Sequence, residues 1–216
     1  MPRKAEKTGI QNPATKRVTP YNNGTDVLLF DTVVDSREPW DKKAFAKKNF
    51  LYINKAHFMS GWNSNSKDEY ITSMYTRKNQ QIAIFKNGEM LENGTVAELQ
   101  DRLKELNMYG SLYIFAHCIE DGQLYMFTLT SSGLYSWSEF SDQYFKAQHS
   151  PDFNFVGYKD YEGDKNYAKK LPEFQYVDVD EKMFAKVEVA YNKSRDAAKE
   201  FIEIKTGIKK TLNSES

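Results

Sequence analysis

Apolar and polar residues alternate in several short segments through the middle of the chain, and this pattern predicts a β-rich core. Apolar side chains at every second position are typical of strands that bury one face. Five such strands are predicted, at Phe50–Met59, Glu69–Arg77, Gln81–Lys86, Ser111–Ile119 and Gln123–Thr130. The dipeptide Asn87-Gly88 after the third strand and the sequence Glu120-Asp121-Gly122 between the last two are typical of tight turns.

A helical periodicity lies between the third and fourth of these strands. Thr95 and Glu98 have the spacing of a capping box, in which the side chain of each residue accepts a hydrogen bond from the backbone N–H of the other. Apolar residues then recur on one helical face, at Val96, Leu99, Leu103 and Leu106. The predicted order β-β-β-α-β-β matches an OB-fold, a small Greek-key barrel that binds oligonucleotides and oligosaccharides.

Further elements are predicted on both sides of this unit. They are a strand at Val27–Val34, a helix at Leu134–Ala147, strands at Phe153–Tyr161 and Phe174–Val179, and a long helix at Glu181–Lys205 that Asp180 can cap. The expected fold class is mainly β with helices (α+β), in the form of an OB-like five-stranded barrel with extra strands and a long C-terminal helix. The expected parts are a flexible basic N-terminal arm (1–26), an OB-like nucleic-acid-binding domain (27–180), the C-terminal helix (181–208) and a tail (209–216).

The charge balance limits the kind of surface that the chain can offer to a ligand. The 216 residues include 30 Lys and Arg and 30 Asp and Glu, so the formal net charge is zero. This argues against binding through bulk positive charge, but it is compatible with a groove in which basic residues are concentrated. The arm is basic and could add phosphate contacts through Arg3, Lys4, Lys7, Lys16 and Arg17.

Motifs for catalysis and for metal binding are missing from the sequence. It contains no Gly-rich phosphate-binding loop and no GxSxG motif, and its acidic residues do not have the spacing of a metal site. His117 and Cys118 are neighbours on a predicted strand and therefore point to opposite faces, which excludes a nucleophile–base pair and favours a buried structural cysteine. We expect a protein that is not an enzyme and that needs no cofactor and no metal.

The hydropathy pattern also bears on the location of the protein. No apolar run reaches the roughly 20 residues of a membrane-spanning helix, and no signal peptide is recognised. We therefore expect a cytoplasmic protein without a membrane partner.

Aromatic residues interleaved with basic ones on the predicted strands are the main functional signal. Proteins that bind single-stranded nucleic acid stack bases on aromatic faces and follow the backbone with Lys and Arg, and each stacked base contributes about 1–3 kcal/mol. The candidate stacking residues are Trp62, Tyr70, Tyr75, Tyr113 and Tyr125, and the candidate phosphate contacts are Arg77, Lys78 and Lys86. Each tyrosine has a second interpretation as a core or rim residue. Trp62 lies in a polar stretch, where an exposed indole is costly unless it has a function such as ligand binding.

Several short motifs add a family resemblance. They are Ser60-Gly61-Trp62, the strand Tyr70–Tyr75, the helix start Gly94–Leu99, the segment Ser131–Phe140 and the segment Lys169–Phe174. In these motifs the chain resembles a family of phage-encoded OB-fold single-stranded-DNA-binding proteins. The resemblance implies a role in DNA replication or recombination in the host cytoplasm, with single-stranded DNA and replication or recombination proteins as partners. Many members end in an acidic tail that recruits such partners, but Thr211–Ser216 carries a single acidic side chain, Glu215.

Two other functions remain open at this stage. The first is a protein-interaction or structural virion accessory protein, which would use the barrel as a scaffold and the apolar stripe of the C-terminal helix for assembly. That stripe consists of Phe184, Val187, Tyr191, Ala198, Phe201 and Ile202. The second is an enzyme subunit whose site a partner completes. The oligomeric state is not determined by the sequence.

Overall fold

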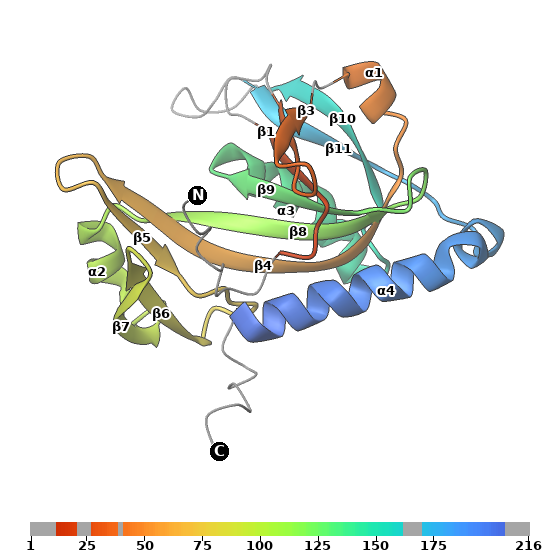
Figure 1. Ribbon diagram of the computed structural model, residues 1–216. Coiled ribbons are helices and arrows are strands. Elements are labelled where there is room, and N and C mark those ends of the chain that lie inside the picture. The colour runs from red at the N-terminus through yellow and green to blue at the C-terminus, as the bar shows by residue number, and fades with distance from the viewer. Residues whose placement is uncertain (1–11, 21–26, 39–40, 162–169, 206–216) are drawn as a thin grey trace, which may run out of the picture.

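The computed structural model describes residues 12–20, 27–38, 41–161 and 170–205 of the chain. Within these ranges eleven strands form one mixed sheet, with four helices around it (Figure 1). The strands are β1 (Lys16–Pro20), β2 (Val27–Asp31), β3 (Ser36–Glu38), β4 (Phe50–Asn63), β5 (Asp68–Thr72), β6 (Gln81–Lys86), β7 (Glu89–Thr95), β8 (Tyr109–Cys118), β9 (Leu124–Thr130), β10 (Phe153–Asp160) and β11 (Lys170–Tyr176). The helices are α1 (Lys42–Phe45), α2 (Gln100–Glu105), α3 (Ser132–Lys146) and α4 (Glu181–Lys205). The expectation of a mainly β protein with helices is confirmed.

The sheet is organised around the long strand β4. Its order is β3-β2-β1-β9-β8-β4-β5-β6-β7, and the hairpin of β10 and β11 joins the start of β4. The pairing of β1 with β9 is parallel, and the other strand pairings of the described residues are antiparallel. β4 and β8 pair along most of their length and form the long central ribbons of Figure 1.

One face of the sheet, which we call the α3 face, is covered by α3 and by the β10–β11 hairpin. Trp137 and Phe140 of α3 pack there against Phe50, Phe153 and Phe174 in a core of closely spaced rings. Such contacts between buried aromatic rings stabilise the fold beyond the area that they remove from water. This cluster is the main core of the protein.

The short helix α2 covers the far end of the same face. Leu99 and Leu103 pack there against Ile82 and Ile84 of β6 in a second buried cluster. Tyr70 belongs to that cluster and pairs with Gly61 of β4. His57, four residues before Gly61 on the same strand, pairs with Leu112 of the main core. Because side chains alternate along a strand, both clusters lie on one side of the sheet.

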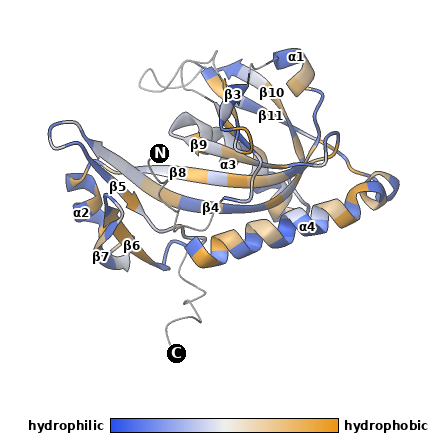
Figure 2. Cartoon of the chain, viewed as in Figure 1, coloured by the Kyte–Doolittle hydropathy of each residue, from blue (hydrophilic) through white to orange (hydrophobic). Residues whose placement is uncertain are grey.

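The opposite face, which we call the α4 face, is covered by α4 over part of its area. Ala198, Phe201 and Ile202 of α4 pack against Phe115 and Met126 in a third cluster. Figure 2 shows hydrophobic and hydrophilic segments alternating along α4, as expected for a helix that buries one side. The remainder of the α4 face has no helix on it among the described residues (Figure 1).

Several local predictions are confirmed. The long helix Glu181–Lys205 has the predicted bounds, and the backbone N–H of Met183 donates to Asp180 Oδ1 at 2.7 Å. The capping box is present, because Thr95 N donates to Glu98 Oε2 at 2.7 Å and Glu98 N donates to Thr95 Oγ1 at 3.3 Å. Helix α2 itself begins only at Gln100.

The predicted strand Glu69–Arg77 is wrong in its second half. β5 ends at Thr72, and Tyr75 forms one isolated bridge with His57. Ser73 N still donates to Ala83 O, in the register of β5 with β6, and the chain then leaves the ladder because Met74 N donates to Lys205 O, at the end of α4. Contacts distant in sequence therefore end a strand that the local pattern continued.

Strand β7 was not predicted. Its side chains are mostly exposed and polar, so its sequence lacks the apolar alternation of a half-buried strand. The predicted turn before it is confirmed: Asn87 and Gly88 have positive φ values of 50° and 90°, as a tight hairpin turn requires.

The N-terminal segment 1–26 was expected to be a flexible arm, and this is wrong for its described part. β1 lies between β2 and β9, and Val18 is fully buried in the main core. Lys16 Nζ binds Asp31 Oδ2 at 2.6 Å and also contacts the Glu38 carboxylate. Residues 1–11, 21–26 and the expected tail 209–216 lie outside the described residues.

Other element ends differ from the prediction by a few residues. The strand expected to reach Val34 ends at Asp31, whose Oδ1 accepts the N–H of Val33 at 2.7 Å and turns the chain. β4 runs on to Asn63, so Trp62 lies on a strand and not in a loop. In the part of the chain that is described, no helix is long and apolar enough to cross a membrane.

Candidate functional site

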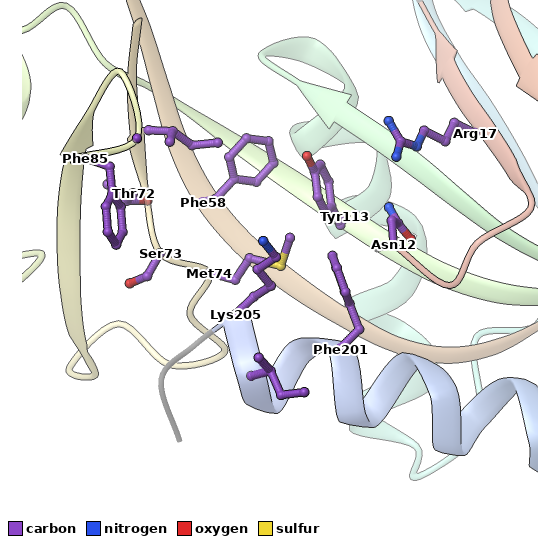
Figure 3. A pocket seen from close by; sticks show the side chains of 13 residues that line it. Asn12, Arg17, Phe58, Thr72, Ser73, Met74, Phe85, Tyr113, Phe201 and Lys205 are labelled. Carbon is purple, nitrogen blue, oxygen red and sulfur yellow. The ribbon is translucent and has the colours of Figure 1, made fainter. Parts of the chain in front are cut away.

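A pocket of about 680 Å³ opens on the α4 face, at the C-terminal end of α4. Its walls come from β1, β4, β5, β6, β8 and α4, so it forms where distant segments converge. In Figure 3 Arg17 and Phe85 lie at its opposite ends, with Phe58 and Tyr113 between them. Ligand sites are typically concave and mostly apolar, with a few polar groups, and this pocket has that character.

Two aromatic rings form the middle of the pocket. Phe58 of β4 and Tyr113 of β8 have ring centroids 4.4 Å apart and planes inclined by 57°. Phe58 is buried and Tyr113 is half-buried. Burial raises the pKa of Tyr113, although the nearby Arg17 acts in the opposite direction, so the phenol keeps its proton at neutral pH.

The charges around the pocket have one sign. Arg17 and Lys205 line it, and none of the described residues that line it is Asp or Glu. Arg17 is exposed and has no ion pair with another described residue. Lys205 Nζ lies 5.9 Å from the ring centroid of Phe201, in a cation–π arrangement. An anionic group would therefore meet no like charge in the pocket wall.

Helix α4 supplies one wall and is tied to the sheet at several points. Lys205 O accepts the N–H of Met74 at 3.3 Å, and the rings of Phe115 and Phe201 are 5.9 Å apart. Further along the helix, Ser194 Oγ lies 3.0 Å from Nδ1 of the buried His117. Burial lowers the pKa of His117, which favours the neutral imidazole.

Two of the predicted stacking residues lie on the α4 face. Tyr113 lines the pocket itself. Trp62 lies near the end of β4, opposite Glu69 of β5, with 59% of its surface exposed. The exposure of Trp62 agrees with the sequence argument that an indole in this polar stretch is not a core residue.

The other three predicted stacking residues are core side chains, so their assignment as exposed platforms is wrong. Tyr70 and Tyr75 pack in the cluster beneath α2, where only 7% and 8% of their surfaces are exposed. Tyr125 is 2% exposed, donates from its hydroxyl to Asp121 Oδ2 at 2.8 Å and accepts from Lys48 Nζ at 2.9 Å. Their ring faces are covered by protein and are not available to a base.

The three predicted phosphate contacts lie outside the pocket. Lys86 Nζ binds Asp68 Oδ2 at 3.0 Å, and its register opposite Tyr70 places it on the α3 face. Arg77 and Lys78 are exposed in the turn that follows Tyr75 and do not line the pocket. The structure therefore brings none of these three cations together with Tyr113.

Other residues of the pocket were not recognised as site residues. Phe58 and Phe85 lie on predicted strands but are not among the predicted stacking residues, and Lys205 is predicted only as the last residue of a helix. Arg17 was counted in the arm, where a phosphate contact was considered. The sequence does contain one signal that could have identified Phe58. Phe58 and Trp62 are four residues apart, so they share one face if the strand continues to Trp62.

Cys118 has the structural role that the sequence suggested. It is a free thiol, fully buried in the main core on the α3 face, while His117 points toward α4. Burial raises the pKa of the Cys118 thiol to about 12, so it is not a thiolate at neutral pH. Among the described residues, no group of three or more His, Cys, Asp and Glu side chains is arranged to hold a metal ion.

Comparisons with protein-family models, with curated proteins and with solved structures found no match for this chain. We therefore infer a function from the pocket and from the face around it.

Proposed function

We propose that this chain is a non-catalytic single-stranded-DNA-binding protein that holds DNA on its α4 face. Unpaired bases would stack in the pocket on the half-buried ring of Tyr113, which the buried Phe58 supports from behind, and Arg17 and Lys205 would contact phosphates. The observation that carries the proposal is the combination of aromatic rings with cations, without a carboxylate among the described residues of the pocket wall.

The pocket favours a single strand over a duplex. The ring of Tyr113 lies in a hollow between the sheet and the end of α4, so only a base that has left its own stack can reach it. Stacking of bases on aromatic side chains does not depend on the nucleotide sequence, because every base has a π-face. Because the net charge of the chain is zero, its affinity for DNA has to come from this local surface and not from long-range attraction between the whole protein and the phosphates.

The strand connections support an OB-like interpretation of the central sheet. β6, β5, β4, β8 and β9 are neighbours in that order, and α2 lies between β7 and β8 in the sequence. The long β4 pairs with both β5 and β8, as the first strand of an OB-fold does with the second and fourth. The second edge of β9 pairs with β1, and no pairing of β6 with β9 is present among the described residues. We therefore propose an open OB-like sheet and not a closed barrel.

A role in phage DNA replication or recombination, in the host cytoplasm, is part of the proposal and rests on the motif resemblance. Coating of exposed single strands would protect them from nucleases and from re-pairing.

The alternative of assembly through α4 has less support. Ala198, Phe201 and Ile202 of the predicted stripe pack against the chain's own sheet. They are not free to bind a partner while α4 is docked.

Fluorescence anisotropy of a labelled oligo-dT and of a labelled duplex, each at two salt concentrations, tests the proposed function. We expect salt-sensitive binding to the single strand and much weaker binding to the duplex. Absence of binding to the oligo-dT at low salt would refute the proposal.

A further inference from the structure

We infer that a bound single strand continues beyond the pocket to a second stacking site formed by Trp62 and Tyr109. This inference rests on the proposed function and extends its site toward the far ends of β4 and β8. Tyr109 was not among the residues predicted from the sequence.

The strand register places both residues on the same face as the pocket. Ser60 of β4 pairs with Tyr109 of β8, and Trp62 is two residues beyond Ser60. Phe58 pairs with Ser111, which is two residues from Tyr109 and two from Tyr113. Because side chains alternate along strands, all of these residues belong to the α4 face. The same face therefore leads from the pocket rings, past Ser60 and the buried Ser111, to the second pair of aromatic residues.

Trp62 and Tyr109 are both unusually exposed. Their exposed fractions are 59% and 68%, and neither ring contacts another ring among the described residues. Buried rings such as Tyr125 have covered faces, whereas these two are open to a planar ligand. Two neighbouring exposed aromatic residues on a face that already carries an aromatic pocket indicate a binding surface.

The backbone under these residues is held in place. A Cβ added to Gly61, next to Trp62, would lie 2.8 Å from the carbonyl oxygen of Leu106 and 3.0 Å from that of Asn107. Met108, next to Tyr109, is buried in the cluster under α2. The two rings are therefore carried by a packed corner of the fold, which reduces the entropy cost of binding.

The second site would bind different nucleotides from the pocket. Tyr109 and Tyr113 are four residues apart on β8, which corresponds to about 13 Å along a strand. Neighbouring bases are about 3.4 Å apart in a stacked strand and about twice as far apart in an extended one, so two neighbouring bases cannot span this distance. Glu69 stands opposite Trp62 and disfavours a phosphate there, so the contact at this end is made by stacking. A dinucleotide would therefore fill the pocket and leave the second site empty.

The test compares the full chain with its Tyr109→Ala variant, using a thymidine dinucleotide and oligo-dT of about 16 nucleotides. We expect Tyr109→Ala to weaken binding of the longer oligonucleotide by roughly 5- to 150-fold and to leave binding of the shorter one unchanged. Tyr109→Phe keeps the ring and should retain full affinity. Tyr135→Ala removes a comparably exposed tyrosine, 52% exposed on α3, and is the matched control that should change neither affinity.

The outcomes separate this inference from the proposed function. If the unaltered chain binds neither oligonucleotide, the proposed function itself fails. If it binds the longer one and Tyr109→Ala binds it equally well, the second site is refuted while the function stands. An equal loss for both lengths also refutes the second site, because Tyr109 would then act through the pocket or the fold. Thermal unfolding of each variant shows whether a loss of affinity is caused by misfolding. If Tyr109→Ala misfolds, the folded Tyr109→Phe variant is used in its place. If that variant binds the longer oligonucleotide with full affinity but the fluorescence of Trp62 does not change on binding, the inference is refuted.

Discussion

The ring of Tyr113 lies against the ring of Phe58, with centroids 4.4 Å apart, although 55 positions separate the two residues in the chain. The antiparallel register of β4 and β8 produces this contact, because Phe58 pairs with Ser111 and Ala56 pairs with Tyr113. The two rings are thus diagonal neighbours on one face of the sheet. Their placement by two long paired strands makes the floor of the pocket rigid.

The first prediction concerns the ring of Tyr113. Tyr113→Ala should lower the affinity for oligo-dT by roughly 5- to 150-fold, because one stacking surface is removed. Anisotropy titration measures this change. Tyr113→Phe retains the ring and should bind nearly as well as the unaltered chain. Unchanged affinity of the alanine variant, with an unchanged unfolding temperature, would contradict a stacking role.

The second prediction concerns the charge of Arg17. If its guanidinium contacts one phosphate, Arg17→Ala should reduce the slope of log affinity against log salt by about 0.7. Arg102→Ala is the matched control, since Arg102 lies on α2 and is already paired with Glu92 and Glu105. The same slope for all three proteins would show that Arg17 makes no phosphate contact.

The third prediction concerns the close packing at Gly61. A methyl group there would lie too close to the carbonyl oxygens of Leu106 and Asn107, which are backbone atoms and cannot simply rotate away. We expect Gly61→Ala to lower the free energy of unfolding by about 1–3 kcal/mol, measured by denaturant titration. At Gly110 an added Cβ would meet only Leu134 Cδ1, at 3.9 Å, so Gly110→Ala should cost much less. Equal stability of the two variants would mean that the corner beneath Trp62 is not tightly packed.

The fourth prediction concerns pH and the docking of α4. Burial lowers the pKa of His117 from its ordinary value of 6.5, and Asp121 only partly opposes this. The unfolded chain then binds more protons than the folded one as the pH falls below 6.5. The contribution of His117 to the free energy of unfolding should therefore be complete above that pH and decrease below it.

The unfolding temperature at pH about 7.5 and about 5.5 measures this effect. The unfolding temperature of His117→Asn should fall less on acidification than that of the unaltered chain. Burial also lowers the pKa of His57, but its contribution is the same in both proteins. An identical loss in both proteins would assign the acid sensitivity to other groups.

Local interactions account for the parts of the fold that the sequence predicts well. The helix Glu181–Lys205, the capping box of Thr95 and Glu98, and the turn at Asn87-Gly88 all depend on residues within a few positions of each other. Their geometry is therefore encoded in short stretches of the chain. The alternating pattern also identified most of the strands and the mainly β class.

Tertiary structure decided which aromatic residues are accessible. Tyr70 and Tyr113 both lie on strands with alternating patterns, yet one packs under α2 and the other lines the pocket on the opposite face. The alternation defines two faces but does not say which of them a helix covers. The inclusion of β1 in the sheet, and hence the position of Arg17 beside Tyr113, depends on pairing with β9, more than 100 residues away. Such pairing energies come from contacts between distant segments, so only the folded chain determines the pocket.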